Sequence, residues 1–190
     1  MQAQITYLDN SGFAVREKHR FLIFDCWNQR PGNGRQGLAG GVIAPEELAD
    51  EQVAVFVSHA HGDHYDPAVF NWEEKIADIR YILSDDIAPH AGALMAAPHE
   101  TYTLDGMTIE TLRSTDEGVA FLVETDGLTV YHAGDLNWWH WEGEAPQWNA
   151  EMARAYQAEI GRLQGKRIDI AFIPVDPRLE ESMLLGIEYF

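Results

Sequence analysis

An apolar strand that runs directly into three histidines and a carboxylate is the most constraining feature of this chain. The segment reads Val53-Ala-Val-Phe-Val-Ser-His59-Ala-His61-Gly-Asp63-His64. Its uninterrupted, β-branched start is typical of a buried strand. Neutral imidazole and carboxylate are ligands that divalent transition metals such as zinc prefer. The sequence therefore predicts a metal-binding loop at the end of a buried strand.

The spacing within this loop suggests how its ligands are shared. Residues two apart point the same way in an extended segment, so His59 and His61 can hold one ion together. Asp63 and His64 come one step later and can face a neighbouring ion. The alternative is a surface loop that is merely rich in histidine. We disfavour it, because composition alone seldom places this order of residues directly after a buried strand.

The HxHxDH pattern after a hydrophobic strand resembles the signature of the metallo-β-lactamase superfamily. Two later segments extend the resemblance, Ser114-Thr-Asp116-Glu-Gly118-Val-Ala-Phe-Leu-Val and Gly127-Leu-Thr-Val-Tyr-His132-Ala-Gly-Asp135. The resemblance implies an α+β fold, a four-layer αββα sandwich, formed by a single domain over residues 1–190. It also implies that Asp135 bridges two ions, and that Asp116 stands where most members place a third histidine for the first ion.

The resemblance implies a chemistry as well. One or two divalent ions (zinc, with manganese or iron as alternatives) would provide a hydroxide that attacks a small-molecule ester, lactone or phosphoester. We expect Asp63 to orient this nucleophile and His140, shortly after Asp135, to contact substrate. Members usually supply a final histidine from a strand near the C terminus, whereas no histidine follows His140 here. Either the chain lacks this strand, which we favour, or the second metal site is weak, or a residue elsewhere supplies the missing ligand.

Two other functions remain open. A metal-binding protein with little catalysis, acting in sensing or assembly, would fit Asp116 and the missing histidine. A nucleic-acid hydrolase is disfavoured by charge, because 31 acidic against 13 basic residues give a formal net charge of −18, which repels a phosphate backbone. We expect a small-molecule substrate as the partner and leave the oligomeric state open.

The same sequence bears on the compartment. It has no apolar stretch of the ~20 residues that a membrane span requires and no visible signal peptide. Cys26 is the single cysteine, so no disulfide can form within the chain. We expect a cytoplasmic protein in which Cys26 is a small buried residue rather than a ligand.

Several side chains near these motifs allow two interpretations. Asp25 either orients a ligand histidine from behind the metal loop or simply ends its strand. Asp66 either supports the loop or, as we favour, caps a helix that begins at Pro67. For His132 we favour packing over metal binding. Four tryptophans either wall a pocket beside the metals or attach the following helix to the sheet: Trp138, Trp139, Trp141 and Trp148.

Hydrophobic periodicity and turn residues predict strands that alternate with helices. A glycine-rich loop over 28–41, which includes Pro31, and the tight turns Asp105-Gly106 and Asp126-Gly127 separate these elements. The expected strands are 4–15 and 20–24 around a turn at 16–19, then 53–57, 80–84, 102–104, 107–112, 119–125, 128–132 and 168–174. The expected helices are a short one from Pro45, then 67–76, 86–95, 144–163 and 178–190.

Overall fold

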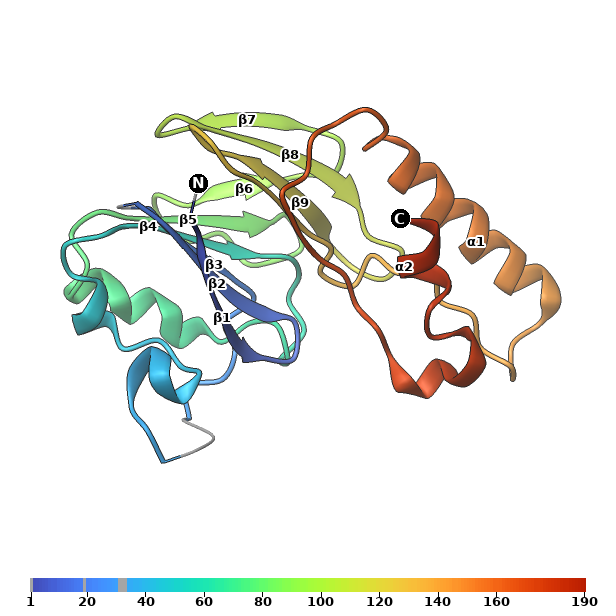
Figure 1. The fold of residues 1–190 in the computed structure, drawn as a ribbon, viewed down its shortest axis with the longest axis horizontal. Coiled ribbons are helices and arrows are strands. Elements are labelled where there is room, and N and C mark those ends of the chain that lie inside the picture. The colour runs from blue at the N-terminus through green and yellow to red at the C-terminus, as the bar shows by residue number, and fades with distance from the viewer. Residues whose placement is uncertain (1, 19, 31–33) are drawn as a thin grey trace. The chain divides into compact units, whose positions relative to one another are not determined.

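The computed structural model describes residues 2–18, 20–30 and 34–190 (Figure 1). Its contacts divide the chain into two compact units, Met1–Ala96 and Ala97–Phe190. Each unit contains one β-sheet, and short helices accompany both, which confirms the predicted α+β class. His19, in the expected first turn, and Pro31, in the expected glycine-rich loop, lie outside the described residues.

The first unit has a six-stranded sheet in the order β1-β2-β3-β4-β5-β6. The pairs β1–β2 and β2–β3 are antiparallel, and the remaining pairs are parallel. Parallel strands covered on both faces read as continuous apolar runs, which is why β4 was legible in the sequence. The strands are β1 Gln4–Asp9, β2 Gly12–Glu17, β3 Arg20–Phe24, β4 Gln52–Val57, β5 Ile79–Ser84 and β6 Leu94–Ala96.

Helices of the first unit are short and of the 3-10 type: η1 Gly37–Gly40, η2 Pro45–Leu48 and η3 Pro67–Glu74. Val69 and Trp72 of η3 pack into the same core cluster as Val55 and Val57 of β4. The Asp66 carboxylate accepts a hydrogen bond from the Ala68 amide at 2.9 Å, which confirms the expected cap.

The second unit has a five-stranded sheet in the order β11-β10-β9-β8-β7. All of its pairs are antiparallel except β10–β11, which is parallel. Tyr156 and Ile160 of α1 pack into a core cluster with Leu122 and Tyr131 of the sheet (Figure 1). The elements are β7 Thr101–Leu104, β8 Met107–Arg113, β9 Val119–Glu124, β10 Thr129–His132, α1 Pro146–Gly161, β11 Ile170–Phe172, η4 Pro177–Ser182 and α2 Leu185–Tyr189.

Two predicted elements of the first unit were wrong. The strand expected over 4–15 is two strands, β1 and β2, because the chain turns at Asn10 while apolar residues continue on both sides. The helix expected over 86–95 is a series of turns followed by β6. Pro89 has no amide hydrogen to donate, and Gly92 has a φ of 81°, so a helix cannot continue through either residue.

Two predicted helices form differently from the expectation. The one at 67–76 is the 3-10 helix η3, and the one at 178–190 is divided into η4 and α2. Glu180, with φ 50° and ψ −119°, interrupts the helical backbone within η4. The hairpin turn at Asp105-Gly106 is confirmed, because both residues have the positive φ (47° and 76°) that such two-residue turns require.

Candidate metal centre

The predicted metal loop, which contains His59, His61, Asp63 and His64, follows directly after β4. His59 and His64 are buried, whereas His61 and Asp63 are exposed. The His59 ring lies 4.6 Å from the His61 ring and 4.0 Å from the His64 ring, measured between centroids. The amides of His64 and Tyr65 both donate to the His61 carbonyl at 3.0 Å, which turns the loop back on itself. The first unit therefore gathers the three predicted imidazoles in one cluster.

Asp25 lies behind this cluster and is fully buried. Its carboxylate accepts the Ser58 amide at 2.7 Å and contacts Nδ1 of His64 at 2.8 Å. A carboxylate on the second nitrogen of a histidine fixes the ring orientation and makes the first nitrogen a better ligand. Asp25 therefore does more than end β3, because its carboxylate holds the His64 ring in place.

Ser58 is a supporting residue that sequence reasoning missed. Its hydroxyl donates to Oδ2 of Asp25 at 2.7 Å and lies 2.9 Å from Nδ1 of His59. Because the one hydroxyl hydrogen goes to Asp25, Nδ1 of His59 must carry the hydrogen in the second contact. Nε2 of His59 then holds the lone pair with which an imidazole binds a metal. Its position directly before His59 is a weak signal in the sequence, because serine is too common for that position alone to identify the role.

The protonation state of His59 suits a ligand. Burial, together with the positive charge that the neighbouring His64 can carry, lowers the pKa of His59 from 6.5 to about 4. The imidazole is therefore neutral near pH 7, which metal coordination requires.

This shift predicts how the metal-free protein responds to acid. Between pH 6.5 and about 4 the unfolded chain binds a proton at His59 that the folded chain does not. The folded state is therefore increasingly destabilised as pH falls through this window. Urea unfolding of the metal-free protein at several pH values should show this loss, and His59→Asn should make the dependence shallower. An identical slope in His59→Asn would contradict the assignment.

Two further residues hold the loop from outside it. The Asp86 carboxylate accepts the Ala60 amide at 2.9 Å, and the Asn10 side chain donates to Asp63. Neither residue was singled out in the sequence, because each is far from the loop along the chain and belongs to a type that is common in turns.

In the second unit, Asp116 follows β8 and Asp135 follows β10. β9 runs antiparallel to both strands, so these two loops leave the same edge of the sheet. The Thr115 hydroxyl donates to the Asn137 carbonyl at 2.7 Å and accepts the Asn137 amide at 3.0 Å, which ties the loops together. The two predicted acidic ligands therefore share one sheet edge, Asp116 exposed and Asp135 half-buried.

The histidines near Asp135 differ in their surroundings. His132 is buried, accepts the Gly134 amide on Nδ1 at 3.2 Å, and lies with its ring 6.2 Å from that of Phe172. These contacts confirm the packing role. His140 is half-buried, and its contact with substrate stays a prediction.

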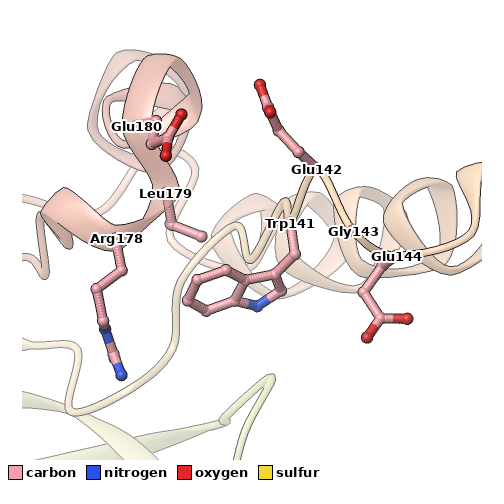
Figure 2. Close-up of a pocket in the computed structure, with 7 residues that line it drawn as sticks. All are labelled: Trp141, Glu142, Gly143, Glu144, Arg178, Leu179 and Glu180. Atoms are coloured by element: carbon pink, nitrogen blue, oxygen red, sulfur yellow. The ribbon is translucent and has the colours of Figure 1, made fainter.

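Among the tryptophans after Asp135, Trp138 takes the expected packing role, and a tryptophan wall beside the metals stays a prediction. Trp138 packs against Tyr156 of α1 and Tyr189 of α2, with ring centroids 6.2 and 5.9 Å away. Trp139 donates to the Asp135 carbonyl at 3.2 Å and stacks on Trp141. Trp141 lines a pocket of about 400 Å³ together with Glu142, Gly143, Glu144, Arg178, Leu179 and Glu180 (Figure 2).

Cys26 lies in the core of the first unit, 2% exposed. Burial is the main reason that the pKa of its thiol is raised to about 12. A thiol in this state is a poor metal ligand, which confirms the expectation of a small buried residue.

Curated proteins of similar sequence are described as metal-dependent hydrolases. The relatives include a UPF0173 metal-dependent hydrolase of Thermococcus kodakarensis, 26% identical over 146 residues, and one of Desulforamulus reducens, 25% identical over 150 residues. Each match covers 70% of this chain and 61% of the relative, so the chain spans about three fifths of the length of these relatives.

Solved structures show the same fold. A proposed metal-dependent hydrolase of Parabacteroides distasonis matches with a TM-score of 0.55 and 19% identity, over 92% of this chain and 70% of that one. A diiron β-hydroxylase of Streptomyces venezuelae matches with a TM-score of 0.53 and 15% identity, over 90% of this chain and 34% of that one.

Among the described residues, no helix has both the length and the apolar character needed to cross a membrane.

The model of the β-lactamase superfamily domain matches residues 4–142. The matched segment contains the HxHxDH loop and both later segments, through Asp135. Because this match covers well over half of the chain, the chain belongs to the β-lactamase superfamily.

Proposed function

We propose that this chain is a metal-dependent hydrolase domain. The carrying observation is the buried arrangement in which Asp25 and Ser58 support His64 and His59 through their Nδ1 atoms. Such support is typical of histidines that bind a metal, and a merely polar loop has no need of it. The relatives described as metal-dependent hydrolases support the same class of activity.

The proposed ligands are assigned by residue type, by support within each unit and by family resemblance. His59, His61 and Asp116 would hold the first ion. Asp63 and His64 would hold the second, and Asp135 would contribute to both. Zinc is the proposed metal. Manganese and iron are alternatives, because Asp116 offers a harder oxygen ligand in place of an imidazole that would favour zinc.

The chain's own side chains divide the proposed work. A bound divalent ion lowers the pKa of its water towards neutrality and so supplies a hydroxide at physiological pH. Asp63 would orient this nucleophile, and His140 would contact the substrate. Asp25 and Ser58 would hold His64 and His59 in their ligating orientation throughout.

The pocket lined by Trp141 has none of the proposed metal ligands in its lining; it is the proposed place for part of the substrate and suggests the substrate class. Its volume of about 400 Å³ suits a small molecule, and Figure 2 shows the carboxylates of Glu142 and Glu144 directed away from the indole ring. The one cationic side chain of the lining, Arg178, already pairs with Asp176. This acidic surround favours an uncharged ester or lactone over a phosphoester or a nucleic acid.

A cytoplasmic location is proposed as well, since a single cysteine suits a reducing compartment.

The direct test combines metal analysis with a substrate panel. The purified chain should contain a divalent transition metal, and its activity on esters and lactones should be lost to a chelator and return with added metal. Activity confined to phosphodiesters would favour the phosphoester or nucleic-acid alternative. Bound metal without turnover of any panel member would favour a sensing or assembly role.

Asp116 provides a second test of the ligand set. Asp116→Ala should weaken the first, tighter binding step for zinc more than the second, because it removes one ligand of the first ion. Asp116→His should shift preference from manganese or iron towards zinc. Competition titrations measure both effects, and Glu117→Ala, at the exposed neighbour, is the matched control. If Asp116→Ala binds metal as the wild type does, then Asp116 serves only the turn before β9, where Ser114 Oγ accepts its amide at 3.1 Å.

A further inference from the structure

The turn between β1 and β2 has an unusual backbone. Asp9 and Asn10 both adopt positive φ, 98° and 46°, and neither is glycine. Such conformations cost free energy and persist where the surrounding structure holds them, often beside functional sites. Gly12, which follows, cannot carry a side chain, because a Cβ there would lie 2.8 Å from the Asp9 carbonyl and 2.9 Å from the Asp25 carbonyl. The turn is therefore held against the segment that carries Asp25.

The Asn10 side chain reaches the metal loop from this turn. Its Nδ2 donates to both the backbone carbonyl and Oδ2 of Asp63, each at 3.1 Å. Asp63 is exposed, and an exposed carboxylate otherwise samples several rotamers. Two contacts from one amide restrict both its backbone and its side chain, and direct Oδ1, rather than Oδ2, towards other partners.

Asn10 is itself held by a chain of hydrogen bonds. The backbone amide of Asn10 donates to Oδ1 of Asp9 at 3.0 Å, and Oδ2 of Asp9 accepts from the side-chain Nδ2 of Asn28 at 2.9 Å. Oδ1 of Asn28 in turn accepts the Arg30 amide at 2.8 Å. The segment after β3 thus fixes Asp9, Asp9 fixes Asn10, and Asn10 fixes Asp63.

We infer that Asn10 is a positioning residue that orients the Asp63 carboxylate for the second metal ion, with Asp9 and Asn28 holding it in place. The inference rests on the proposed function, in which Asp63 binds that ion. The positive φ at Asn10 suits the hairpin turn, as that of Asp105 does between β7 and β8, whereas the side-chain amide of Asn10 contacts the metal loop.

Asn10→Gly separates these two effects, because glycine adopts the same φ without strain but has no amide to donate. We expect its thermal stability to equal or exceed that of the wild type, while affinity at the second zinc-binding step falls about 10- to 100-fold, as is typical when a group supporting a ligand is lost. Asn10→Asp, which places a carboxylate beside Asp63, should lose at least as much. Asp105→Gly is the matched control, since it relieves a positive φ of 47° in the β7–β8 hairpin and should bind zinc normally.

Calorimetric zinc titration of the wild type, Asn10→Gly, Asp63→Asn and the double variant decides the question. If Asn10 acts through Asp63, the double variant should bind zinc no more weakly than Asp63→Asn alone. Wild-type affinity in Asn10→Gly, or losses that add fully in the double variant, would overturn the inference. If zinc affinity depends on Asn10 in this way but the wild type hydrolyses no member of the substrate panel, the proposed function fails and the inference stands. If the wild type binds no zinc, both fail.

Discussion

Replacing His59 and His61 together by alanine is expected to remove the tightly bound metal ion. The two rings lie 4.6 Å apart, and in the proposed ligand set the loss of both nitrogens would leave the first ion with carboxylate ligands alone. Loss of one supporting group costs roughly 10- to 100-fold in metal affinity, so loss of two ligands should exceed ~100-fold. Elemental analysis after reconstitution and desalting should find metal in the wild type and background levels in the double variant.

The matched control is a double variant at two histidines outside the cluster, His90→Gln/His99→Gln. His90 stacks on Phe70 and contacts Glu73, and His99 contacts Glu159, so each has a packing or ion-pairing role. This control should keep the wild-type metal content. If His59→Ala/His61→Ala retains full metal content, the metal loop is not the binding site.

Asp135→Asn is expected to abolish most hydrolysis without unfolding the domain. The substitution keeps the size of the side chain and removes the charge proposed to act on both ions. Removal of one group that stabilises developing charge typically lowers turnover about 100- to 1,000-fold, and a comparable fall in kcat/KM is expected on the best ester or lactone of the panel. Asp135 is half-buried on a loop, so thermal unfolding should change little.

Asp126→Asn controls for this change, because Asp126 is an exposed aspartate in the turn between β9 and β10. It should retain wild-type kcat/KM. Full activity of Asp135→Asn with normal metal content would refute the bridging assignment, whereas lost activity with a lowered unfolding temperature would point to a structural role.

Sequence reasoning succeeded where local pattern and burial agree. The central strand β4 was legible because both of its faces are buried, and the β7–β8 hairpin was legible from Asp105-Gly106. It failed where short-range signals conflict. The apolar residues on either side of Asn10 hid the turn between β1 and β2, and the helix predicted over 86–95 is one that Pro89 and Gly92 forbid.

The candidate site shows the same division. His59, His61 and His64 lie within six positions of the sequence, so their spacing alone predicted that they share one site. The support given by Asp25 and Asn10 depends on hydrogen bonds across 39 and 53 residues, which no local pattern encodes. Ser58 is adjacent to the motif, but serine is so common that its role emerges only from its distances to Asp25 and His59.

The central proposal is that His59 and His61, together with Asp116 and Asp135, would hold one metal ion. A crystal structure of the zinc-loaded chain, with anomalous diffraction recorded on both sides of the zinc edge, tests it most directly. We predict a zinc peak about 2.0–2.1 Å from a nitrogen of each histidine and about 2.0–2.2 Å from a carboxylate oxygen of each aspartate. A zinc peak away from His59 and His61, or one at these histidines with both aspartates directed into solvent, would contradict the claim.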